Sequence, residues 1–162
     1  ALFIFIDTMV LAAGDGDAFS SEQRKEHWQW LEQQLREASA DWIFIVGHHP
    51  VYSAGAHGDQ EMLVQWLDPL LLNHSVDAYI AGHDHDAQLL KSKEGLSHII
   101  CGAGSKVRTS GTTSRQSLMF QQGVYSFASM ELNRTHLTTS WISDQGEVIY
   151  RHSQTPRAKR AL

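Results

Sequence analysis

Three short apolar runs, separated by stretches with helical periodicity, constrain most strongly what this chain can fold into. The apolar runs cover residues 2–6, 42–46 and 78–81. Between them, residues 20–38 and 60–72 repeat apolar side chains at helical spacing, which predicts two amphipathic helices. Alternating strands and helices, followed by further strands, favour a layered α/β fold with a mixed sheet.

The boundaries of the two helices follow from individual residues. Ser20 with Gln23 three positions later has the pattern of a capping box, and the first helix is predicted to run from there to about Ala38. A polar loop is predicted before it, over residues 11–20. The second helical stretch contains Pro69, so a kink or a break into two short helices is expected.

The pattern changes after the third apolar run. Residues 88–91 and 98–101 predict a hairpin, and residues 102–123, which are rich in Ser, Thr and Gly, predict a long loop. Three later segments alternate apolar and polar side chains and predict an antiparallel β-meander: residues 124–132, 136–143 and 147–152. The expected architecture is therefore α/β, β-α-β-α-β followed by a β-meander, in one domain without a linker.

Composition narrows the classes of function. The net charge of −5 does not indicate a general nucleic-acid binder. No apolar run approaches the roughly 18–20 residues that span a membrane. The lone Cys101 cannot form an internal disulfide or a thiolate metal site. Ten histidines in 162 residues are many, and they direct attention to places where histidines cluster.

Two histidine motifs directly follow predicted strands. They are Gly47-His48-His49-Pro50 and Gly82-His83-Asp84-His85. Ligands of parallel α/β sheets gather beyond the carboxyl ends of the strands, and imidazole is a common ligand of zinc and iron. We therefore predict that His48, His83 and His85 converge at one edge of the sheet and bind metal.

These motifs resemble the last two metal-binding blocks of the purple acid phosphatases, within the metallophosphoesterase superfamily. The resemblance rests on residues 46–53 and 81–85, with support from residues 5–8 and 101–104. It extends over residues 2–150 and is greatest to the small, tartrate-resistant branch. It implies a layered αββα metallophosphoesterase sandwich, of which residues 1–162 would form the C-terminal part.

The resemblance also implies the metal ligands. His48 and His83 would bind a divalent ion, Fe(II), Zn(II) or Mn(II), and His85 would bind Fe(III), in a dinuclear Fe(III)–M(II) centre. The centre would hydrolyse phosphate monoesters by attack of a metal-held hydroxide, the reaction of an acid phosphatase.

Other residues receive roles from the same resemblance. His57, nine residues after His48, would face the substrate and either bind its phosphate or protonate the leaving group. Asp86 would support His85. Apart from the resemblance, His49 is expected to shape the loop after His48 or to support the ligand side chains. Asp86 stands where the family more often has asparagine, which would alter the surroundings of His85.

The family's first three metal-binding blocks, which supply the remaining four of seven ligands, do not occur in this sequence. We therefore expect the N-terminal half of the enzyme, as a second chain or as preceding sequence, to be the partner. The isolated chain is expected to be inactive. The resemblance favours a secreted, lysosomal or periplasmic location.

Three alternatives stay open on the sequence. Another metallophosphoesterase, such as a phosphodiesterase, would differ in its relative rates on monoesters and diesters. A catalytically inactive metallophosphoesterase-like binding domain would hold no metal ions. A single structural zinc site is the third, although such sites usually have four ligands and often thiolates.

Overall fold

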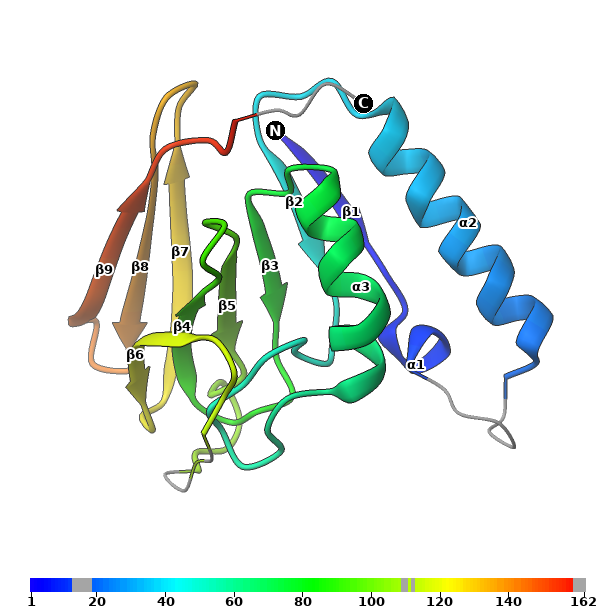
Figure 1. The fold of residues 1–162 in the computed structure, drawn as a ribbon. Coiled ribbons are helices and arrows are strands. Elements are labelled where there is room, and N and C mark those ends of the chain that lie inside the picture. The colour runs from blue at the N-terminus through cyan, green and yellow to red at the C-terminus, as the bar shows by residue number, and fades with distance from the viewer. Residues whose placement is uncertain (13–18, 109–110, 112, 159–162) are drawn as a thin grey trace.

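Two β-sheets and two long helices form three layers in the computed structural model, which describes residues 1–12, 19–108, 111 and 113–158. Figure 1 shows α2 (Ser21–Glu37) and α3 (Glu61–Asn73) on one side of the six-stranded sheet and the three-stranded sheet on the other. The predicted α/β class with a mixed sheet is confirmed. No helix in the described part of the chain is long and apolar enough to cross a membrane.

The larger sheet has the strand order β1-β2-β3-β5-β4-β6. Its parallel strands are β1 (Leu2–Phe5), β2 (Ile43–Val46), β3 (Ala78–Ala81) and β5 (Ser97–Cys101). β4 (Ala87–Lys91) pairs antiparallel with both β5 and β6 (Ser117–Gln122). The smaller sheet is the predicted antiparallel meander of β7 (Ser126–Leu132), β8 (Leu137–Ser143) and β9 (Val148–Gln154).

The central strands of the larger sheet are buried on both faces. Ile43 and Ile45 belong to the core shared with the helices, whereas Phe44, which lies between them, belongs to the core shared with β8. This alternation follows from the pleat, which points successive side chains to opposite faces. Trp141 of β8 is fully buried in the second core and donates from Nε1 to the carbonyl oxygen of Ile100, 3.2 Å away.

The predicted start of the first long helix is confirmed. The Ser20 hydroxyl accepts from the backbone N–H of Gln23, and the Gln23 side chain accepts from the backbone N–H of Ser20, which completes the capping box. The expected break of the second helix is wrong, because α3 continues through Pro69. Burial of Leu63 and Leu67 holds that helix against the sheet and offsets the backbone hydrogen bond that Pro69 cannot donate.

Two further expectations are corrected. The long loop predicted over residues 102–123 contains β6. Within the described part of the chain β6 is an edge strand that pairs with β4 alone, and it therefore lacks a fully buried, apolar signature. A short helix, α1 (Thr8–Leu11), follows β1, because the Asp7 carboxylate accepts from the backbone N–H groups of Met9 and Val10. Within the loop predicted over residues 11–20, residues 13–18 lie outside the described part.

His98 in β5 is a buried histidine between the sheet and α3. It is 1% exposed, and its Nε2 lies 3.7 Å from the Asp68 carboxylate. Neither ring nitrogen has a hydrogen-bond partner among the described residues. Burial, with a smaller contribution from the charge of Arg157, lowers the pKa of His98 to about 3. The folded protein therefore keeps this imidazole neutral through mildly acidic pH.

We expect His98 to make stability fall as the solution is acidified. Unfolded histidine takes a proton near pH 6.5, whereas folded His98 does so only near pH 3, so the unfolded state binds more protons between these values. The free energy of unfolding should fall by about 1.4 kcal/mol per pH unit between pH 6 and pH 4 from this group.

Urea unfolding of the wild type and of His98→Phe at pH 7.0, 5.5 and 4.5 measures this effect. The variant should show a shallower loss of stability toward acid. Asp68, whose raised pKa comes mainly from burial, acts in the opposite direction but is present in both proteins. Equal pH slopes in the two proteins would contradict the assignment.

Candidate metal centre

The carboxyl ends of the parallel strands meet at one edge of the larger sheet, and the two histidine loops begin there. Backbone hydrogen bonds tie these loops together beyond the strands. The N–H of Gly47 donates to the carbonyl oxygen of Ile80 at 3.0 Å, and the N–H of Gly82 donates to that of His48 at 3.1 Å. The loop after β2 and the loop after β3 are therefore held side by side.

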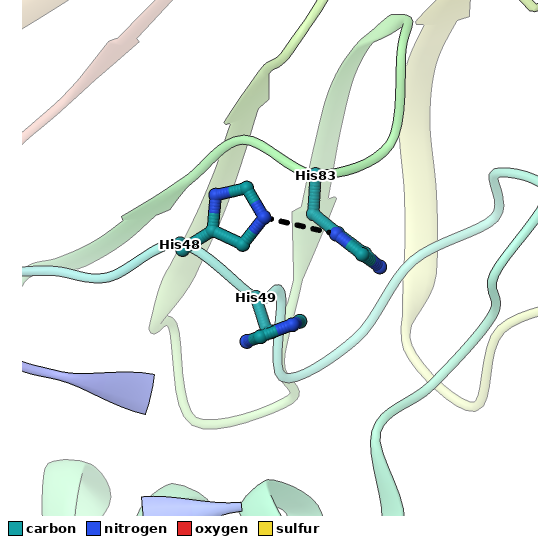
Figure 2. Close-up of side chains that lie close together, drawn as sticks. All are labelled: His48, His49 and His83. Atoms are coloured by element: carbon teal, nitrogen blue, oxygen red, sulfur yellow. Dashed lines mark hydrogen bonds between the residues drawn. The ribbon is translucent and has the colours of Figure 1, made fainter. Parts of the chain in front are cut away.

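Four imidazole rings gather at this edge. One ring nitrogen from each of His48, His49 and His83 lies within 4.8 Å of the others, and Nε2 of His48 is 3.0 Å from Nδ1 of His83 (Figure 2). The ring of His57 lies against that of His83, with 4.2 Å between ring centroids. Imidazole nitrogens at this spacing can share one metal ion.

The cluster matches the sequence prediction in part. His48 and His83 are brought together as expected, and His49, expected to support the ligands, also directs a ring nitrogen to the cluster. Nδ1 of His49 lies 2.9 Å from the hydroxyl of Thr8 in α1. His85 does not belong to the group of three, but its buried Nδ1 has no hydrogen-bond partner within the described part of the chain.

Two histidines of the cluster have lowered pKa values, which favours their uncharged forms. Burial, followed by the neighbouring imidazoles of His49, His57 and His48, lowers the pKa of His83 to about 4. Burial is also the largest cause of the lowered pKa of His49. Neutral imidazoles keep the lone pairs that bind metals, so these nitrogens fit a borderline cation such as zinc or iron.

His83 has a backbone φ of 63°, in the left-handed region that residues with a Cβ seldom adopt. Such a conformation costs about 1–2 kcal/mol for an ordinary residue, and the surrounding structure must compensate for it. Here the surrounding hydrogen bonds hold His83 in this conformation. The N–H of Asp84 donates to the carbonyl oxygen of Gly82 at 2.8 Å, directly across His83.

Asp84, between the two motif histidines, fastens His57 to the cluster. Its side chain is fully buried and accepts from the Ser53 hydroxyl. It also accepts from His57 twice, from the backbone N–H at 3.1 Å and from Nδ1 at 2.7 Å. Gly55 passes so close that an added Cβ would clash with the Asp84 carboxylate. The segment 53–57 is therefore folded tightly around this carboxylate.

Asp86 also helps to hold the segment 53–57 in place. Its carboxylate accepts from Nε2 of Gln88 at 2.7 Å and from Nε2 of Gln121 at 2.8 Å. The same two glutamines bind both sides of Ala54, because Gln88 accepts from its N–H and Gln121 donates to its carbonyl oxygen. Burial is the main reason that the pKa of Asp86 is raised. Asp86 thus supports the segment 53–57 through these two glutamines.

A pocket of about 150 Å³ opens beside the cluster. His49, His57 and His83 line it together with Asp59 and Glu61. Both carboxylates interact with Arg115. The pocket therefore offers a small space in contact with three imidazoles, a size that suits a phosphate group.

Four residues of the site were not predicted from the sequence: Thr8, Ser53, Asp84 and Arg108. Asp84 had a local signal, since it stands between two predicted ligands. Thr8 and Ser53 lie in segments whose only signal was their resemblance to the purple acid phosphatases. Arg108, whose Nη1 lies 3.2 Å from Nε2 of His57, comes from a segment predicted to be a loop and had no signal.

The fold and these motifs recur in known proteins. A family model described as calcineurin-like phosphoesterase matches residues 7–87. Glideosome-associated protein 50 of Plasmodium falciparum (isolate 3D7) is 36% identical over 167 residues, which cover 100% of this chain and 41% of that protein. Human tartrate-resistant acid phosphatase type 5 is 32% identical over 177 residues, covering 99% of this chain and 54% of that protein.

Solved structures agree with the sequence comparison. The structure described as GAP50, the anchor in the inner membrane complex of Plasmodium, superposes with a TM-score of 0.88 at 32% identity, over 98% of this chain and 50% of that one. Purple acid phosphatase PPD1 from yellow lupin (Lupinus luteus) seeds shares the fold, with a TM-score of 0.75 at 15% identity, over 94% of this chain and 30% of that one. The chain thus spans about half the length of the curated relatives that it matches.

Gly102, just after β5, is required by the close approach of the loop that carries His83. A Cβ on Gly102 would clash with the carbonyl oxygen of Asp84 and lie 3.2 Å from the carbonyl carbon of Gly82. Both obstacles are backbone atoms, which cannot move aside as the end of a flexible side chain can. Gly104, two residues later, has no atom within 4 Å of an added Cβ.

We expect Gly102→Ala to lower the free energy of unfolding by about 1–3 kcal/mol, the usual effect of overpacking a tight site. It should also displace His83 and weaken zinc binding. Gly104→Ala is the matched control and should leave both properties unchanged. Urea unfolding and zinc titration measure the two effects, and equal behaviour of the two variants would contradict the role given to Gly102.

Proposed function

This chain belongs to the calcineurin-like phosphoesterase family and is related to the purple acid phosphatases, and we propose that it contributes the histidine side of an acid phosphatase centre. The proposed substrates are phosphate monoesters. The observation that carries this proposal is the gathering of His48, His49 and His83, with His57 against them, at the carboxyl edge of the parallel strands. A ligand site is expected at that edge in folds of this class.

The proposed metal ligands are His48 and His83 for a divalent ion, Fe(II), Zn(II) or Mn(II), and His85 for a ferric ion. The first two fit one ion, because their nitrogens already lie 3.0 Å apart. His85 fits through a buried Nδ1 that has no partner among the described residues. Two bound ions would supply a water molecule of lowered pKa and neutralise charge on the phosphate.

His57 is proposed to lie beside the phosphate, in the pocket that it lines together with His49 and His83. Asp84 holds its ring by a 2.7 Å hydrogen bond to Nδ1, so the ring keeps one orientation toward His83. Segment 53–57 is in turn held by the side-chain amides of Gln88 and Gln121. A fixed orientation lowers the entropy lost when a substrate binds.

The proposed partner is the N-terminal half of the enzyme. Within the described residues, the candidate metal site consists of three histidines and no carboxylate. A pair of ions with a total charge of about +5 requires several carboxylates to balance it. The relatives are about twice as long as this chain, which is consistent with further ligands outside it. We therefore propose that residues 1–162 form the C-terminal part of one metallophosphoesterase domain and are inactive alone.

Metal binding by the chain tests the first part of this proposal. Zinc titration followed by mass spectrometry of the metal content should give about one ion per chain. Loss of a supporting residue alone typically weakens metal affinity 10- to 100-fold, so His48→Ala and His83→Ala should weaken it by about 100-fold or more. His136→Ala, at an exposed position outside the cluster, is the matched control.

Turnover tests the second part. The longer protein, in which the N-terminal half accompanies this chain, should hold about two ions and hydrolyse p-nitrophenyl phosphate at pH 5. It should act more slowly on bis(p-nitrophenyl) phosphate, and the reverse order would identify a phosphodiesterase. Turnover by residues 1–162 alone, or metal binding that survives both His48→Ala and His83→Ala, would contradict the proposal.

A binding domain without catalysis is the second candidate. It is favoured by the 36% identity to glideosome-associated protein 50, whose structure is described as that of an anchor. Such a domain requires no metal ions and no turnover. The metal content and the p-nitrophenyl phosphate assay of the longer protein therefore separate the two candidates.

A further inference from the structure

Arg108 lies at the histidine cluster but belongs to none of the motifs. Its backbone N–H donates to the carbonyl oxygen of His85 at 2.9 Å, which fixes the segment after β5 against the second histidine loop. Its guanidinium Nη1 lies 3.2 Å from Nε2 of His57. Both ends of the residue are thus attached to the site.

The positive charge of Arg108 is not matched by a carboxylate in the described residues. Arg115 interacts with Asp59 and Glu61, and Arg36 pairs with Glu32 on the surface of α2. Arg108, by contrast, makes its side-chain hydrogen bond to a ring nitrogen. A guanidinium has five N–H donors in a planar fork, so most of them stay available for an anion.

Hydrogen bonds through His57 hold the guanidinium in place. Asp84 accepts from Nδ1 of His57, because a carboxylate can only accept, so Nδ1 carries the proton. Nε2 then accepts from Arg108, because a guanidinium can only donate. The buried Asp84 carboxylate therefore orients the imidazole of His57, and the imidazole orients the guanidinium beside the cluster.

We infer that Arg108 binds a non-bridging oxygen of the substrate phosphate, and that Asp84 and His57 position its guanidinium for this contact. This inference rests on the phosphatase function proposed above. Guanidinium groups match phosphate oxygens in pairs, and such charged hydrogen bonds are stronger than neutral ones. A monoester presents three non-bridging oxygens and a diester two, so Arg108 favours monoesters.

The affinity of the metal-loaded longer protein for inorganic phosphate tests this assignment. Arg108→Ala should raise the dissociation constant measured by calorimetry about 10- to 100-fold, as expected for the loss of a hydrogen bond to a charged group. Arg108→Lys keeps the positive charge but not the planar arrangement of donors, so its dissociation constant should lie between those of the wild type and Arg108→Ala. Arg36→Ala, at an exposed arginine of α2, is the matched control and should bind phosphate like the wild type.

Kinetics and metal content provide separate readouts. Arg108→Ala should raise KM for p-nitrophenyl phosphate more than it lowers kcat, and should reduce the preference for monoesters over diesters. Its metal content should equal that of the wild type. Asp84→Asn should weaken phosphate binding less than Arg108→Ala, and the double variant should be no weaker than Arg108→Ala alone, because both changes act through the same guanidinium.

The outcomes separate this inference from the proposed function. If the wild type holds two ions and turns over substrate while Arg108→Ala binds phosphate equally well, the inference is wrong and the phosphatase stands. If Arg108→Ala loses its metal or unfolds, Arg108 is a structural residue and the inference is also overturned. A wild type without metal and turnover overturns the proposed function and this inference with it.

Discussion

The parallel pairing of β2 with β3 is the constraint on which the site depends. It ends both strands at the same edge of the sheet, and two backbone hydrogen bonds continue the contact into the loops that carry His48 and His83. The imidazoles consequently lie closer together than they would in a flexible chain. Burial, followed by the charges of the neighbouring imidazoles, lowers the pKa of His83 to about 4 and keeps this ring neutral.

The loops around the crowded imidazoles are held in place by hydrogen bonds to two buried carboxylates, Asp84 and Asp86. Asp84 is held by Ser53 and His57, and Asp86 is held by Gln88 and Gln121. Buried carboxylates are tolerated only when hydrogen bonds replace their hydration, and each of these accepts at least two. The same hydrogen bonds fix the segment 53–57, so the fold and the chemistry of the site share one set of contacts.

Much of the architecture could be predicted, because it depends on local patterns. Several elements have a local sequence signal, namely a periodic pattern of apolar side chains or a residue typical of a helix start or a turn. These elements are the strands before the histidine motifs, the capping box at Ser20 and the β-meander. β6 was not predicted because it is an edge strand whose one partner among the described strands is β4. The four-residue helix α1 was not predicted because its main local signal is a single capping carboxylate, Asp7. Pro69 led to the prediction of a break that does not occur, since packing of α3 outweighs the backbone hydrogen bond that proline lacks.

The sequence by itself determined the α/β class, the position of two histidine motifs at strand ends and the resemblance to purple acid phosphatases. These features are local, so the residues that create them are neighbours in the chain. Only the tertiary structure decided that His49 joins the cluster and that Asp84 orients His57 toward Arg108. Those contacts join segments that are 27 to 51 residues apart, and their geometry follows from how the sheet, the loops and the segment after β5 pack together.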